Sequence, residues 1–170
     1  EPSDVLRGLR LSKTARGVEL PFDSETISLT LKPDKEHPAL EVFVRLVDRR
    51  GFSTRKIRLG TLASADWVEM RADLLPDEAD RLAPSSPNTV LTIGVESSDG
   101  ARSIGGGSVL LGEIKITAKS GRIDVLEPFD SVSGWYALKP LPNGVTDVVR
   151  VSEEPGMGSD SSAIEFKWHA

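Results

Sequence analysis

The sequence predicts an all-β protein, an antiparallel β-sandwich of the jelly-roll type with at most one short helix. Three observations support this fold class. Apolar and polar residues alternate with a period of two in much of the chain, as they do in half-buried strands. Turn-forming residues separate these runs, for example at Asp99-Gly100 and Asn143-Gly144. The helices that a parallel α/β sheet needs between its strands are missing from the pattern.

The alternating runs predict strands along the whole chain. In the clearest run, Ile27, Leu29 and Leu31 share one face and polar residues share the other. The run at residues 40–47 is apolar enough on both faces to lie centrally in a sheet. The complete set covers residues 5–10, 27–32, 40–47, 55–59, 90–95, 109–116, 145–151 and 163–168.

The run at residues 109–116 contains adjacent apolar residues, so its two faces have to be assigned. Simple alternation places Leu110, Ile114 and Ile116 on one face. It places Leu111 on the other face, together with charged residues. We therefore expect Leu110 to share the face of Ile114 and Ile116.

One segment departs from the strand pattern and is the only plausible helix. It covers residues 73–82, where Pro76 is followed by acidic residues, an arrangement that suits a helical first turn. We expect the acidic stretch from Asp77 to Asp80 to be a solvated loop or the start of a helix.

The pattern divides the chain at about residue 122. Residues 1–122 are expected to form the jelly-roll sandwich. Residues 123–170 are expected either to begin a second β module or to supply strands that dock on the first unit, because so few strands cannot bury an apolar face alone. The chain begins with Glu1, so we expect it to be a piece of a longer polypeptide.

The composition excludes several classes of function. The net charge of −5 in 170 residues leaves no basic surface for nucleic acid or for adsorption to anionic lipid. The absence of cysteine excludes disulfides and thiolate metal sites. No run approaches 18 consecutive apolar residues, so we expect that this chain itself does not span a membrane.

Two segments carry a family resemblance, namely residues 57–62 with Trp67 and Leu74, and residues 103–114, where a glycine-led alternating run ends in Ile114. Together they resemble the galactose-binding-like jelly roll that is common among carbohydrate-binding modules, in which such a run forms the late strand that closes the sheet. Residues 126–130 followed by Trp135 resemble the opening of the next such module.

An acidic, cysteine-free pair of such modules resembles the extracytoplasmic region of bacterial ABC-transporter permeases of the FtsX-like type. The resemblance implies a non-catalytic extracytoplasmic module, tethered to the membrane in the full-length protein. The implied role is a scaffold or the recognition of a partner or ligand. The implied partners are other parts of a membrane complex or an envelope glycan, and the orphan C-terminal strands add a homodimer as a further expectation. The alternative is a carbohydrate-binding module of a secreted glycan-active enzyme.

Trp135 and Tyr136 are the candidate ligand-binding residues. They adjoin a glycine-containing turn, and aromatic rings on a loop can stack on a sugar face or pack in the core. We expect Trp67 to pack at an edge of the sandwich and Trp168 to lie in the core or an interface.

No catalytic constellation stands out. Gly105-Gly106-Gly107 is followed by a strand rather than a helix, which predicts a flexible or bulged turn and not a phosphate loop. His37 and His169 stand alone, so no metal site is expected from them. Carboxylates suitable by type alone lie at Asp66, Asp77, Glu78, Asp80, Glu153, Glu154 and Asp160.

Nothing in the sequence selects a pair of these carboxylates for glycoside hydrolysis. We therefore expect no enzyme activity and no cofactor. Calcium bound by loop oxygens stays open as an alternative, because hard cations prefer oxygen ligands.

Overall fold

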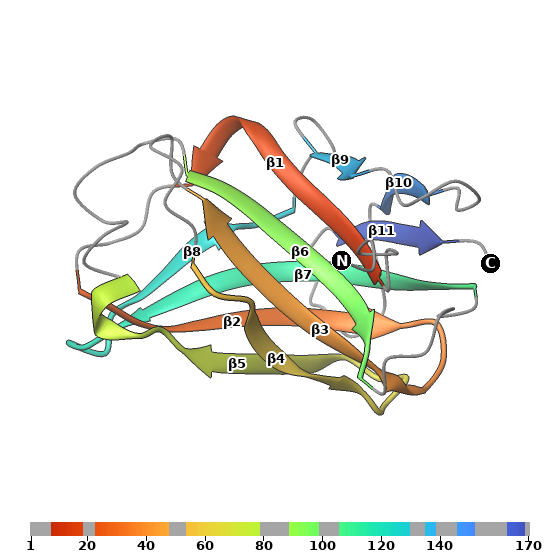
Figure 1. Ribbon diagram of the computed structural model, residues 1–170, viewed down its shortest axis with the longest axis horizontal. Helices are drawn as coiled ribbons and strands as arrows, with labels where there is room; N and C mark the ends of the chain where they lie inside the picture. The colour runs from red at the N-terminus through yellow and green to blue at the C-terminus, as the bar shows by residue number, and fades with distance from the viewer. Residues whose placement is uncertain are drawn as a thin grey trace, which may run out of the picture.

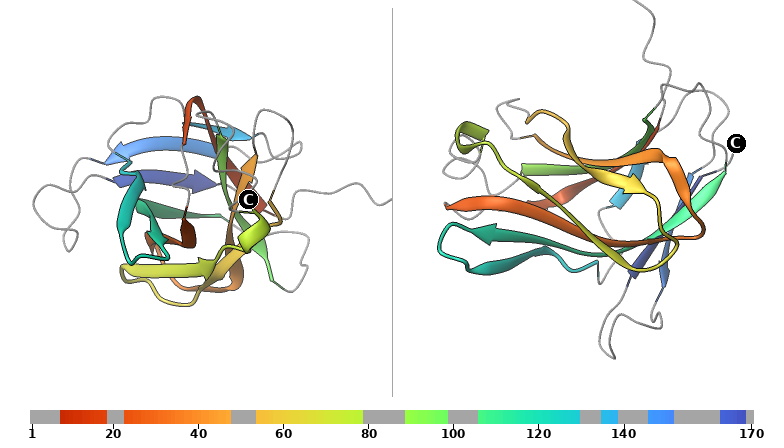
Figure 2. Two further views of the ribbon diagram at one scale, coloured as in Figure 1. Left: turned by 90° about the vertical axis from the view of Figure 1, so that its left-hand side faces the viewer. Right: turned by 90° about the horizontal axis from the view of Figure 1, so that it is seen from below.

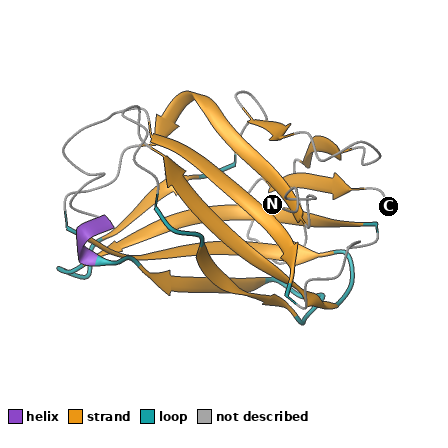
Figure 3. Cartoon of the chain, viewed as in Figure 1, coloured by secondary structure: helices purple, strands orange, loops and turns teal. Residues whose placement is uncertain are grey.

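The computed structural model describes residues 8–18, 23–47, 54–78, 89–98, 106–129, 135–138, 146–151 and 163–168. Among these, only the backbone is described for residues 8–18, 89–90, 127, 135–138, 146–151 and 168. The described residues form antiparallel strands and one helical turn at residues 76–78 (Figures 1 and 3). The strands are β1 (Gly8–Val18), β2 (Ser24–Pro33), β3 (His37–Val47), β4 (Ile57–Leu62), β5 (Val68–Asp73), β6 (Thr89–Ser97), β7 (Gly107–Ala118), β8 (Ile123–Glu127), β9 (Trp135–Leu138), β10 (Thr146–Val151) and β11 (Ala163–Trp168).

The strands form two sheets that face each other, as the view in Figure 2 (right) shows. Sheet A has the order β4-β3-β6-β1-β9. Sheet B has the order β10-β11-β7-β2-β5, and β8 also pairs with β7. Each face that turns toward the opposite sheet is called inner here, and each face that turns away from it is called outer.

The pairing of the first six strands is nested. β3 pairs with β4, β2 with β5, and β1 with β6, so the first three strands meet the next three in reverse order. A nested hairpin of this kind, wrapped so that its pairs alternate between two sheets, is a jelly roll. The predicted fold class is thereby confirmed, and β3 lies centrally between β4 and β6 as expected.

Residues beyond 122 add strands to both sheets. β8 and β11 pair with the same edge of β7, β8 along residues 114–117 and β11 along residues 107–111. β10 pairs with β11, and β9 extends sheet A by pairing with β1. The edge of β7, where the eighth strand of a jelly roll would lie, is therefore occupied by strands from the C-terminal part of the chain.

The core lies between the inner faces. Ile27, Leu29 and Leu31 of β2 are completely buried, as their alternation predicted. They belong to a cluster of apolar residues that includes Val44 of β3 and Phe166 of β11. Burying side chains of this size stabilises the fold by about 1.5–3 kcal/mol each, so the alternating apolar residues are the main source of stability.

Phe43 forms a second buried site on the outer face of sheet A. Its neighbours on β3, Val42 and Val44, belong to the core, so Phe43 projects the other way, yet it is only 2% exposed. It pairs with Gly94 of β6, and the missing side chain of Gly94 makes room for its ring. The Lys56 Nζ lies 5.0 Å from the ring centroid, which is a cation–π contact.

A charged network borders this ring. Glu41 and Glu96 are direct cross-strand partners, an arrangement of like charges that destabilises a sheet unless cations compensate. Arg58 forms ion pairs with both carboxylates, and Lys56 lies 2.6 Å from Glu96. The two cations thus neutralise the carboxylates, and Lys56 also lies over the Phe43 ring.

Three strands were not expected from the sequence. β5 has weak alternation, with Met70 buried and Val68 and Ala72 partly buried against the core. β8 falls in the segment that resembles the opening of another module, and β9 contains Trp135 and Tyr136, for which the sequence predicts no strand. Among the described residues, we find no helix with the length and apolar character needed to cross a bilayer.

Candidate functional site

A hollow of about 450 Å³ lies on the outer side of sheet B, beside the first residues of β7. Its volume falls within the range of about 300–1,000 Å³ that is usual for small-ligand sites. Strands β2, β7 and β11 and the connection between β4 and β5 contribute to it. The lining residues are Lys32, Pro33, Asp34, Ala65, Ser108, Leu110 and Glu165.

The floor of the hollow is a cross-strand row. Leu110 of β7 pairs with Lys32 of β2 on one side and with Glu165 of β11 on the other. Directly paired residues share a face of the sheet, so an apolar side chain lies between an amine and a carboxylate. Glu165 also forms an ion pair with Lys167 at 3.2 Å.

A β-bulge in β7 places Leu110 in this row, and the expectation that Leu110 shares the face of Ile114 and Ile116 is wrong. Leu29 pairs with Ile114, but Leu31 pairs with Leu111, so two residues of β7 oppose the single residue Thr30. One extra residue reverses the side to which all preceding side chains point. Leu111 is therefore the core residue, and Leu110 turns outward into the hollow.

Asp34 forms the rim of the hollow and is held in place on two sides. Its amide donates to the Ser108 carbonyl at 2.9 Å, and its carboxylate lies 2.9 Å from Nε2 of His37. Partial burial acts to raise the pKa of Asp34. The hydrogen bonds from His37 and from the Ser108 backbone outweigh that effect, so the pKa of Asp34 is lowered. Asp34 is consequently an ionised acceptor at neutral pH.

The predicted binding residues, Trp135 and Tyr136, lie on the other sheet. Trp135 pairs with Lys13 and Tyr136 with Ser12, both at the β9 edge of sheet A. Their side chains lie outside the described residues. The backbone alone shows that β9 is not part of the wall of the hollow on sheet B.

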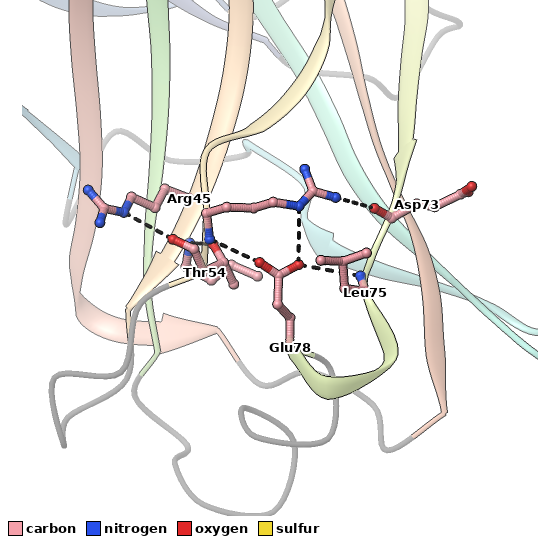
Figure 4. Close-up of polar contacts among 7 residues, drawn as sticks. Arg45, Thr54, Asp73, Leu75 and Glu78 are labelled. Carbon is pink, nitrogen blue, oxygen red and sulfur yellow. Dashed lines mark hydrogen bonds and ion pairs between the residues drawn. The ribbon is translucent and has the colours of Figure 1, made fainter.

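A second polar cluster lies at the end of the sandwich and is shown in Figure 4. Glu78 is only 5% exposed, so it is buried rather than solvated, although residues 76–78 do start a helix as expected. The backbone amides of Arg55 and Leu75 donate to its two carboxylate oxygens at 2.9 and 3.3 Å. The Arg55 guanidinium lies 3.7 Å from the same carboxylate.

The bonds of Glu78 join the start of the helical turn to the segment before β4. Next to it, the Thr54 hydroxyl accepts a hydrogen bond from the Leu46 amide at 3.1 Å, and the Thr54 amide donates to the Leu46 carbonyl at 2.9 Å. Both oxygens of Glu78 are engaged within the chain. We therefore assign this cluster a structural role, namely fixing two connections at one end of the sandwich.

Among the described residues, the remaining candidates add no chemistry to the site. Within the part of the chain that is described, no three His, Asp or Glu side chains are arranged to hold a metal ion. His37 contacts Asp34, while His169 and Gly105 lie outside the described residues. Gly107 begins β7, so the glycines lead into a strand. The half-buried Trp67 precedes β5, and its buried Nε1 has no hydrogen-bond partner among the described residues.

Sequence reasoning missed the residues of the hollow. Lys32, Asp34 and Glu165 are ordinary polar positions of alternating strands or their ends. The one available signal was the pair Leu110-Leu111, because two adjacent apolar residues in an alternating strand, followed here by Gly112, are typical of a bulge. In comparisons with known proteins, no family model matches the chain and no curated protein matches its sequence.

Proposed function

We propose that this chain is a non-catalytic recognition module that binds a polar ligand or partner surface through the hollow on sheet B. The observation that supports the proposal is the combination of groups in the hollow. Lys32 supplies a donor, Asp34 and Glu165 supply acceptors, and Ser108 supplies both around the apolar Leu110. A few placed polar groups around an apolar floor are typical of ligand sites.

The state of Asp34 supports a role in binding rather than catalysis. A carboxyl that acts as a general acid near neutral pH needs a raised pKa. The pKa of Asp34 is lowered instead, because hydrogen bonds from His37 and the Ser108 backbone outweigh the effect of its partial burial. Its carboxylate is therefore suited to accept hydrogen bonds at the rim of the hollow.

We place the module in the extracytoplasmic part of a membrane transporter of the ABC-permease type. This part of the proposal is supported by the sequence resemblance alone. Its test is the full-length protein: flanking transmembrane segments and recovery in the membrane fraction are expected. A flanking glycan-hydrolase domain would instead identify the chain as part of a secreted enzyme.

A carbohydrate-binding module is the second candidate, and the hollow favours it specifically. Sugar hydroxyls hydrogen-bond to carboxylates and amines, while the C–H face of a pyranose packs on an apolar surface. The row of Lys32, Leu110 and Glu165 offers these contacts side by side. An envelope glycan would satisfy both candidates, so the identity of the ligand and the context of the module are tested separately.

The binding test is a titration of the isotopically labelled chain with a panel of envelope oligosaccharides, followed by nuclear magnetic resonance. We expect shift changes centred on Ser108 and Leu110. Lys32→Met and Glu165→Gln should each weaken binding about tenfold, because each removes a hydrogen bond to the ligand that involves a charged group.

Glu69→Gln is the matched control, because Glu69 pairs with Thr30 on the same sheet and does not line the hollow. If Glu69→Gln weakens binding as much as Glu165→Gln does, the hollow is not the site. If no oligosaccharide binds, a photo-crosslinker at position 165 of the full-length protein should capture a neighbouring subunit, whereas one at position 69 should not. Failure of both experiments would refute the proposed role of the hollow.

A further inference from the structure

β8 is an edge strand with an exposed apolar surface. It pairs with β7 on one side, and among the described residues no strand pairs with its other side. Ile123 is 62% exposed and Val125 is 51% exposed. An open strand edge with exposed apolar side chains readily pairs with another strand.

The hairpin between β7 and β8 determines which backbone groups face the open edge. The Gly121 amide donates to the Ala118 carbonyl at 2.8 Å, and Gly121 has a φ of 84°, which favours glycine. The Ala118 amide donates to the Arg122 carbonyl at 2.8 Å. In an antiparallel pair, alternate residues direct their hydrogen-bonding groups to the same side. Because Arg122 faces β7, Ile123 and Val125 direct their amides and carbonyls away from it.

The charges beside these residues favour a second copy of the chain as the occupant. A two-fold antiparallel pairing centred on Ile123 places Arg122 of each copy opposite Asp124 of the other. The alternative centred on Asp124 would bring two Asp124 carboxylates face to face, which destabilises a sheet. Arg122 and Asp124 already attract each other within one chain, at 2.8 Å; Arg122 is exposed and Asp124 is half-buried. Exchanging this pair between copies therefore requires little rearrangement.

We propose that two copies of this chain associate through their β8 strands, antiparallel and centred on Ile123, to form a sheet that is continuous across the dimer. Ile123 of the two copies would exchange backbone hydrogen bonds at the centre. The exposed side chains of Ile123 and Val125 would become partly buried on the outer face of the joined sheets. Opposite charges at positions 122 and 124 would select this register over the alternative centred on Asp124.

Sedimentation equilibrium over about 1 to 500 μM tests the association, because dimerisation depends on concentration. We expect wild type to shift from monomer to dimer. Val125→Lys should weaken the dimer about tenfold or more, because it places a cation at the open edge. Thr61→Lys is the control, an exposed position on β4, the edge strand of sheet A, and should dimerise like wild type.

Charge reversal tests the register. Arg122→Asp alone places aspartates opposite each other in both pairs, and Asp124→Arg alone places arginines opposite each other, so each variant should be monomeric. An equimolar mixture of the two should form a heterodimer, because both pairs are then complementary. Circular dichroism establishes that each variant is folded, since Arg122 also contacts Asp23 within the chain. A monomeric wild type, a Val125→Lys variant that dimerises normally, or a mixture that stays monomeric would each overturn the proposal.

Discussion

Replacing Gly94 by alanine tests the packing of Phe43 on the outer face of sheet A. A Cβ at position 94 would lie 2.9 Å or less from three atoms of the Phe43 ring, whereas ordinary contact begins at 3.4 Å. The ring would have to withdraw by roughly 1 Å from a site in which it is 2% exposed. Overpacking of this kind costs about 1–3 kcal/mol, and displacing the ring from Lys56 forfeits part of a cation–π contact of about 0.5–1 kcal/mol.

Alanine also has a compensating benefit, because glycine inside a strand is less favourable by about 0.5–1 kcal/mol. The net expectation for Gly94→Ala is therefore a loss of about 2 kcal/mol in the free energy of unfolding. The measurement is urea unfolding followed by circular dichroism.

Phe43→Leu supplies the matched background for a double-mutant cycle. The three ring atoms that obstruct the new Cβ are Cζ, Cε1 and Cε2, and leucine has none of them. Gly94→Ala should cost less than about 0.5 kcal/mol in that background, or even stabilise the protein. An equal cost in both backgrounds would refute the reasoning, because the ring would then not be the obstacle.

Three further predictions concern the described polar groups. Glu78→Gln should lower the free energy of unfolding by about 1–3 kcal/mol, because the buried site loses an acceptor for the Arg55 and Leu75 amides. The control Asp77→Asn, at the exposed neighbouring position, should change that free energy by less than about 0.5 kcal/mol. Equal urea midpoints for the two variants would contradict the structural role of Glu78. The lowered pKa of Asp34 means that its ionised form stabilises the native state at pH values above the ordinary pKa of 3.8, and that this stabilisation is lost as the pH falls through the native pKa. The free energies of unfolding of wild type and Asp34→Asn should therefore differ most at neutral pH and converge in acid. A difference that widens in acid would reverse the assigned sign. Trp67→Phe removes a buried N–H that lacks a partner among the described residues, so thermal unfolding should show unchanged or slightly raised stability. A loss of stability above about 1 kcal/mol would show instead that the indole N–H contributes a favourable interaction.

The role of Gly94 could not be derived from the sequence, although the strand that contains it could be. The alternation at residues 40–47 predicted a central strand, and β3 is central. It also set Phe43 apart from Val42 and Val44, but a lone aromatic residue on an outer face does not indicate what covers it. That information lies in the neighbouring strands. Arg58 of β4 and Gly94 of β6 are the cross-strand partners of Phe43, and Lys56, just before β4, lies over its ring.

The candidate site was the least predictable feature. Trp135 and Tyr136 are conspicuous in the sequence because they are aromatic, but the structure places their backbone on sheet A, opposite the sheet that carries the hollow. Lys32, Asp34 and Glu165 carry no motif, and they meet only because β7 pairs with both β2 and β11. The same long-range pairing leaves β8 as an edge strand.

Alternation by itself determined that the protein is built of strands, and it placed Ile27, Leu29 and Leu31 in the core. That pattern is local, since it depends only on successive side chains pointing to opposite sides of one strand. The order of the strands, the bulge that turns Leu110 outward and the open edge at Ile123 and Val125 were decided only by the tertiary structure. These features depend on which distant strand supplies the hydrogen bonds, and an alternating run offers the same backbone groups to every neighbour.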